Sequence, residues 1–155
     1  MAKKEIICAF GTDIDSVAGW MDDGLVAEVG VRPSAGGKPP ILLRVVDDSR
    51  HLIGVDLANG AFAGAIVNLR GQIQHRRCLP VYDRGGDAAL EVVFELLDGL
   101  VDSADGSLLG IGIGAPGLMD ARRGMVRNAV NLDWHNLPLG SLLEERYRLP
   151  VYIAN

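Results

Sequence analysis

The run from Leu109 to Trp134 carries the residues of this chain that are best suited to contact a ligand. It begins as an expected buried strand with glycine at every second position from Gly110 to Gly114, so one strand face is nearly bare and another group can approach the backbone. Pro116 and Gly117 end the strand at its carboxyl end, where α/β sheets bind ligands. Asn131 and Trp134 follow as an amide and a flat apolar ring. These two chemistries together favour a sugar as the ligand.

A second run, Gly54 to Gly60 with the sequence GVDLANG, indicates a strand that ends in a turn. Small residues in such a turn let backbone N–H groups approach a phosphate. Asn-Gly is also a favoured two-residue turn of an ordinary β-hairpin. By turn chemistry alone, Asn59 and Gly60 therefore favour a plain hairpin over a phosphate loop.

The elements that must position these runs follow from hydrophobic periodicity over the larger part of the chain. The expected strands are 51–58, 61–69, 72–80, 108–115, 125–130 (short) and 150–154, and the expected helices are 87–101 and 139–148. The buried stripe of the first helix is predicted to consist of Leu90, Val93, Phe94, Leu97 and Val101. Apart from the short strand, the order is β-β-β-α-β-α-β, a meander followed by right-handed crossovers.

The N-terminal part is smaller and interrupted by glycine and proline. Thr12 or Asp13 is expected to cap a short helix that ends at Gly24, followed by strands 25–31 and 41–46. Helix, strand, loop and strand form the back half of a winged helix, although any small αββ unit has the same pattern. We therefore place two domains at residues 1–48 and 49–155.

The combined run Gly-x-Gly-x-Pro-Gly, then Asn-Leu-x-Trp, an amphipathic helix and Leu-Pro-Val resembles the sugar-contacting segment of the ROK family (repressors, open reading frames and sugar kinases). The resemblance covers the latter two-thirds of the chain and continues more weakly to the N-terminus. It implies an α/β fold: the N-terminal lobe of an actin-like, ribonuclease-H-like domain, incomplete at its C-terminus, preceded by a partial winged-helix-like αββ segment.

The resemblance also implies a sugar site. Gly117 would present its backbone to a sugar, Asn131 would bind a hydroxyl, and Asn155 matches the Asn that precedes the family's catalytic Asp. That Asp would be the next residue, so no catalytic residue is assigned here. Trp134 is expected to pack beneath the loop rather than touch the ligand.

The family's Asp-x-Gly-x-Thr loop, which faces the phosphates of ATP, falls on the second run. Asp56 matches it, whereas Ala58 stands in place of Gly and Gly60 in place of Thr, with Asn59 between them. The loop has lost its hydroxyl donor and gained a methyl group, so we expect a degenerate phosphate loop and no cofactor.

The N-terminal segment 14–28 resembles the recognition helix of ROK repressors running into the wing, and 34–43 resembles their wing-to-core linker. Arg32 and Lys38 are the expected DNA contacts, by analogy with a basic segment that lies in an A·T-rich minor groove. The alternative is an αββ module that packs or dimerises without binding DNA.

Composition restricts the function classes further. The formal net charge is -5, which argues against nucleic-acid binding by the whole surface. Cys8 and Cys78 are expected as buried free thiols, and His51, His75 and His135 as surface residues rather than metal ligands. Because these residues lack the spacing of metal ligands, we expect no metal site. No apolar run is long enough to span a membrane, so we expect a cytoplasmic protein.

Three hypotheses remain. The chain is the N-terminal part of a sugar-responsive ROK transcriptional regulator without catalysis, a fragment of a ROK hexose kinase that needs a second lobe, or a truncated ROK protein without function of its own. In the third case the half-lobe would leave an apolar surface uncovered where a second lobe should pack. We therefore expect a homo-oligomer or a complementing lobe.

Overall fold

The computed structural model describes residues 14–31, 41–58 and 60–155, and the chain forms two compact units, residues 1–49 and 50–155. Several predicted residues lie outside the described ranges: Cys8, the helix-cap candidates Thr12 and Asp13, Arg32, Lys38 and Asn59. No helix within the described ranges is long and apolar enough to cross a membrane.

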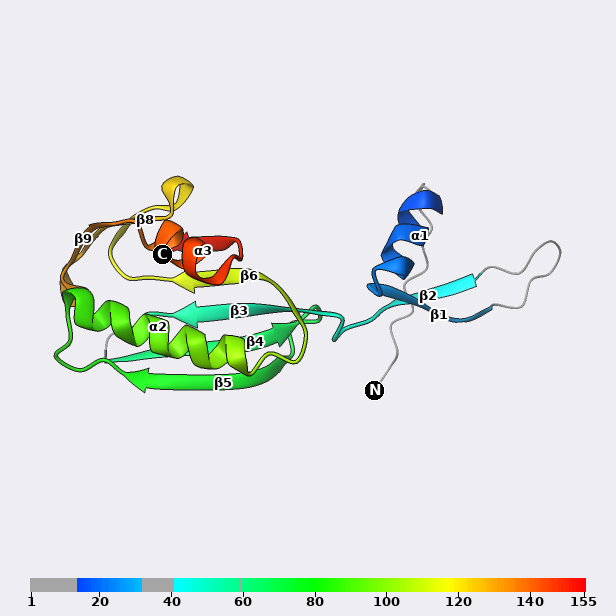
Figure 1. The fold of residues 1–155 in the computed structure, drawn as a ribbon, viewed down its shortest axis with the longest axis horizontal. Helices are drawn as coiled ribbons and strands as arrows, with labels where there is room; N and C mark the ends of the chain where they lie inside the picture. The colour runs from blue at the N-terminus through cyan, green and yellow to red at the C-terminus, as the bar shows by residue number, and fades with distance from the viewer. Residues whose placement is uncertain (1–13, 32–40, 59) are drawn as a thin grey trace. The chain divides into compact units, whose positions relative to one another are not determined.

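The described part of the larger unit is built on a five-stranded sheet in the order β10-β6-β3-β4-β5. Figure 1 shows β6, β3, β4 and β5 of this sheet side by side. Its strands are β3 Arg50–Asp56, β4 Ala61–Asn68, β5 Ile73–Pro80, β6 Ser107–Gly114 and β10 Val151–Ala154. The first three form an antiparallel meander, whereas β6 is parallel to both β3 and β10. The carboxyl ends of β3, β6 and β10 therefore meet at one edge of the sheet.

Two helices complete this α/β lobe. α2, Gly86–Asp102, lies across one face of the sheet, and α3, Leu139–Tyr147, packs beside β10 (Figure 1). Gly64 of β4 allows the close approach of α2, because a Cβ at this position would lie 2.6 Å from Leu100 Cδ1. The predicted order of strands and helices is confirmed.

The buried stripe of α2 is displaced from the predicted one. Leu90, Phe94 and Val101 are only half-buried, because the sheet covers the neighbouring side of the helix and Phe94 lies near Arg146 of α3. The buried residues of α2 are Ala89, Val92, Val93, Leu96, Leu97 and Leu100.

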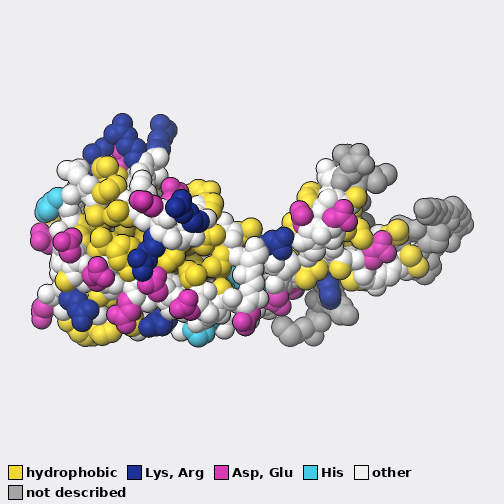
Figure 2. Space-filling view, in the orientation of Figure 1, with side chains coloured by type: hydrophobic (Ala, Val, Ile, Leu, Met, Phe, Trp, Pro, Cys, Tyr) yellow, Lys and Arg dark blue, Asp and Glu magenta, His cyan; other side chains and the backbone are white. Residues whose placement is uncertain are grey.

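Within residues 115–138, a separate three-stranded antiparallel sheet follows β6: β7 Leu118–Asp120, β8 Met125–Ala129 and β9 Trp134–Leu137. Only β8 was expected from the sequence. The 3-10 turns η1, Ala121–Arg123, and η2, Val130–Leu132, join these strands. Figure 2 shows basic side chains gathered over the tip of the β7–β8 hairpin, where η1 carries Arg122 and Arg123.

The smaller unit contains α1, Ile14–Asp22, and the antiparallel hairpin of β1, Val26–Val31, and β2, Ile41–Val45. Gly24 ends the helix with a φ of 70°, as expected for a helix C-terminus. These elements match the predicted helix and hairpin. Their interpretation as part of a winged helix stays a prediction.

Two predictions about single residues are wrong. His51 is buried, because the alternation of β3 puts it on the same covered face as Ile53 and Val55. Cys78 is exposed, because it lies opposite Ala63 on the sheet face that α2 does not cover. In both cases the pairing of strands decides which face a side chain takes. His75 and His135 are exposed, as expected.

Candidate functional site at the carboxyl edge of the sheet

The parallel strands bring the predicted site segments to one edge of the larger unit. The Leu57 N–H donates to the Gly114 carbonyl at 2.9 Å, and the Ala115 N–H donates to the Ala154 carbonyl at 2.9 Å. These bonds join the ends of β3, β6 and β10 side by side. The degenerate phosphate loop, the Pro-Gly turn and Asn155 are therefore neighbours in space.

Gly117 and Asn155 are in direct contact. The Asn155 side-chain amide donates to the Gly117 carbonyl at 2.5 Å. Gly117 has a φ of 92°, and a Cβ there would lie 2.9 Å from the Ala129 Cα. Glycine is thus required by both conformation and space, and the turn is held against the strand that precedes Asn131.

Asn131 occupies a different part of the same edge. It is exposed in η2 and lines a hollow of about 740 Å³ whose lining includes neither Gly117 nor Asn155. Gly60, at the end of the degenerate phosphate loop, lines the same hollow. The structure thus brings Gly117 together with Asn155, and Asn131 together with Gly60.

The degenerate phosphate loop offers little beyond its backbone. Asp56 is exposed at the end of β3, and its Oδ1 lies 3.9 Å from where a Gly114 Cβ would be. Ala58 is exposed, and Gly60 has a φ of 89°. The sequence from Asp56 to Gly60 contains no serine or threonine, so no side-chain hydroxyl can donate to a phosphate here.

Trp134 packs beneath the site, and the prediction of a packing role is confirmed. Its side chain is only 3% exposed, and its Nε1–H donates to the Gly86 carbonyl at 2.9 Å. This bond ties β9 to the N-terminal end of α2 and supports the η2 turn that carries Asn131.

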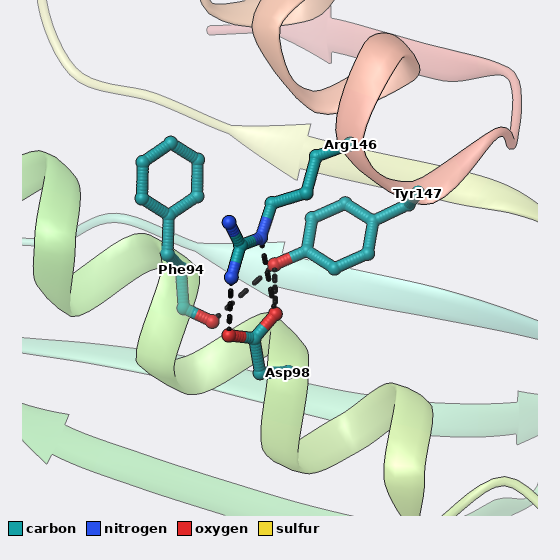
Figure 3. Close-up of polar contacts among 4 residues, drawn as sticks. All are labelled: Phe94, Asp98, Arg146 and Tyr147. Carbon is teal, nitrogen blue, oxygen red and sulfur yellow. Dashed lines mark hydrogen bonds and ion pairs between the residues drawn. The ribbon is translucent and has the colours of Figure 1, made fainter.

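A polar cluster joins α2 and α3 (Figure 3). Both Asp98 carboxylate oxygens accept from Arg146, at 3.2 and 2.7 Å, and the Tyr147 hydroxyl donates to Asp98 at 2.7 Å. The Arg146 guanidinium carbon also lies 4.9 Å from the centre of the Phe94 ring. We call these four residues the α2–α3 clasp.

The clasp perturbs the titration of its members. The hydrogen bond from Arg146 lowers the pKa of Asp98 below its ordinary value of 3.8. Burial, followed by the hydrogen bond to Asp98, raises the pKa of Tyr147. The clasp could not be predicted from the sequence, because residues 48 or more positions apart give no local signal. Since α3 leads into β10, the clasp helps to position Asn155.

No group of three His, Cys, Asp or Glu side chains among the described residues is arranged to hold a metal ion.

A model of the ROK family matches residues 52–155. The chain belongs to the ROK family. The resemblance seen in the sequence is confirmed, and so is the fold.

A solved ROK transcriptional regulator, described as a homologue of the E. coli MLC protein, superposes on 91% of this chain and 37% of its own, with a TM-score of 0.74 and 23% identity. A glucokinase from Streptomyces griseus, solved with glucose and AMPPNP, covers 68% of this chain and 33% of its own, with a TM-score of 0.60 and 28% identity.

Curated ROK relatives include both regulators and kinases. The xylose repressor of Caldicellulosiruptor bescii is 34% identical over 137 residues, 86% of this chain and 34% of the repressor. The glucokinase of Halalkalibacterium halodurans is 31% identical over 110 residues, 68% of this chain and 33% of the enzyme. The chain spans about one third of the length of these ROK relatives.

Proposed function

We propose that this chain is the N-terminal part of a sugar-responsive transcriptional regulator of the ROK family. The observation that carries the proposal is how far each kind of relative extends. The xylose repressors match 86–87% of the chain, whereas the glucokinases match 66–68%. The family model itself begins at residue 52. The additional match to the repressors therefore corresponds to the smaller N-terminal unit.

The phosphate loop supports a regulator over a kinase. ATP-dependent phosphoryl transfer depends on groups that hold and neutralise the phosphates. From Asp56 to Gly60 this chain offers a carboxylate, an amide, two aliphatic side chains and no hydroxyl. A sugar could bind at the carboxyl edge without any of these groups, because its hydroxyls need only amides, carboxylates and backbone.

In the proposed mechanism, sugar binding favours one of two conformations of the protein. A ligand shifts such an equilibrium only by its difference in affinity for the two states. Gly117 and Asn155 come from different segments of the edge and contact each other directly, so a sugar that inserts between them would change their contact. That change would reach the DNA-binding elements and alter the affinity for DNA.

The proposed DNA contacts are Arg32 and Lys38. A gel-shift assay with DNA from upstream of the chain's own gene, in low and moderate salt, tests them. We expect a shift that weakens with added salt and that Arg32→Ala together with Lys38→Ala abolishes. Absence of a shift in both salts would contradict DNA binding by this chain.

The alternative is a ROK hexose kinase fragment, favoured by the 31% identity to a glucokinase and by Asp56 at its family position. Incubation with ATP and a panel of sugars distinguishes the two. The regulator proposal predicts no sugar phosphate above background, and turnover would support the kinase.

The uncovered face of the sheet bears on assembly. This face forms a hollow of about 640 Å³, whose lining includes the small residues Gly54, Gly112 and Ala63. A Cβ on Gly54 would meet nothing within 4 Å, so nothing in the described part of the chain uses the space above it. Asp56 and Arg76 lie on this face, on β3 and β5. Across a two-fold axis, each could pair with the other residue of a second copy. We therefore propose a homodimer through this face.

A further inference from the structure

A polar hollow of about 740 Å³ lies at the carboxyl edge of the larger unit, beside Asn131. Volumes of roughly 300–1,000 Å³ are typical of small-molecule sites. The Val81 N–H donates to the Gly60 carbonyl at 3.0 Å, which joins two of the walls. The walls are Gly60, residues 81–85 and residues 130–133.

Buried contacts support the wall formed by residues 130–133. Trp134 is buried and donates to the Gly86 carbonyl at 2.9 Å. A Cβ on Gly85 would lie 3.0 Å from the Asp133 Cβ, so the loops that carry Gly85 and Asp133 lie close together. Both loops line the hollow.

The side chains around the hollow suit a polyhydroxylated ring. Tyr82 is 72% exposed and lies against Gly60, where a Cβ would be 3.4 Å from its ring. Such a ring can stack on the apolar face of a sugar. Asp83, Arg84 and Asp133 can accept from or donate to the sugar hydroxyls.

The charges argue for a neutral ligand. The residues that line the hollow include two carboxylates, Asp83 and Asp133, and one guanidinium, Arg84. An anion such as a phosphate would meet net repulsion there, whereas neutral hydroxyls can bond to both kinds of group.

We propose that this hollow is a binding subsite for a neutral sugar ring, with Tyr82 as the stacking platform and Asp133 and Arg84 as the groups that select among sugars. The proposal deepens the proposed function and rests on it. Tyr82, Arg84 and Asp133 then join Asn131 as residues that contact the sugar.

Saturation-transfer NMR on the full chain, with a panel of pentoses, hexoses and disaccharides, tests this subsite. We expect Tyr82→Ala to lower the affinity for the bound sugar roughly tenfold, as expected for loss of an aromatic stacking partner. Tyr82→Phe keeps the ring and should bind like the wild type. Tyr152→Ala is the matched control, because Tyr152 is equally exposed, at 73%, but lies on β10 outside the hollow. Asp133→Asn should change the order of preference among the sugars.

The outcomes separate this subsite from the proposed function. Wild-type affinity in Tyr82→Ala would overturn the subsite. If Asn155→Ala then abolished binding, the sugar would lie at the Gly117–Asn155 contact and the regulator proposal would survive. If the wild type bound no sugar of the panel, the sugar-responsive function itself would fail, and the subsite with it.

Discussion

Gly117 and Gly54 have opposite requirements, although both lie near the candidate site. Gly117 has a φ of 92° and packs against the backbone of residues 128 and 129. Gly54 is in an ordinary strand conformation with open space above it. The sequence identifies both as glycine but does not distinguish the one required by geometry from the one that leaves a surface bare.

At this scale we predict that Gly117→Ala lowers the free energy of unfolding by about 1–3 kcal/mol, through backbone strain and the clash with Ala129. Gly54→Ala should leave the stability of the monomer unchanged or raise it by up to about 1 kcal/mol. Urea unfolding followed by circular dichroism measures both. Equal stability of the two variants would contradict the geometry described for Gly117.

The α2–α3 clasp operates at the scale of elements. Asp98 binds Arg146 and Tyr147 from the facing helix, and α3 continues into β10, which ends beside Gly117. The Tyr147 hydroxyl lies closer to Asp98, at 2.7 Å, than to the Phe94 carbonyl, at 3.3 Å, so its single proton goes to the carboxylate. The hydrogen bonds of the clasp therefore require an ionised Asp98 carboxylate.

This arrangement predicts a pH dependence. Because the pKa of Asp98 is lowered by folding, the stabilisation is fully present above its ordinary value of 3.8 and is lost as the pH falls through the lower folded value. Asp98→Asn should be less stable than the wild type at pH 7, and the two proteins should converge as the pH falls below the lowered folded pKa of Asp98. Tyr147→Phe, which removes one hydrogen bond, should cost about 0.5–1.5 kcal/mol. Thermal unfolding measured from pH 7 down to acidic pH tests this prediction. A difference in stability between Asp98→Asn and wild type that does not change with pH would contradict it.

At the scale of the whole molecule, the uncovered sheet face predicts the assembly state. We expect light scattering to report a dimer. Arg76→Glu should shift the equilibrium from dimer towards monomer, because the new carboxylate of each copy would then lie opposite Asp56 of the other copy. The double charge reversal Asp56→Arg with Arg76→Glu should restore the dimer, since a two-fold interface re-forms both pairs. A strictly monomeric wild type would contradict the proposed interface.

The order of strands and helices in the larger unit could be predicted from periodicity, because each strand alternates and each helix has an apolar stripe. The short strands β7 and β9 could not, since three and four residues are too few for a period. The buried position of His51 and the exposure of Cys78 were predicted wrongly, because alternation defines two faces without saying which one a helix will cover.

The sequence by itself determined the family of this protein and the altered phosphate loop, since both depend on residue types at fixed spacing. It also placed Gly117, Asn131 and Asn155 among the candidate sugar contacts. Only the tertiary structure decided that Asn155 binds Gly117, whereas Asn131 shares a hollow with Tyr82 and Asp133. The reason is physical: parallel strands and the loops that follow them bring together residues from distant parts of the chain, and local sequence carries no record of those contacts.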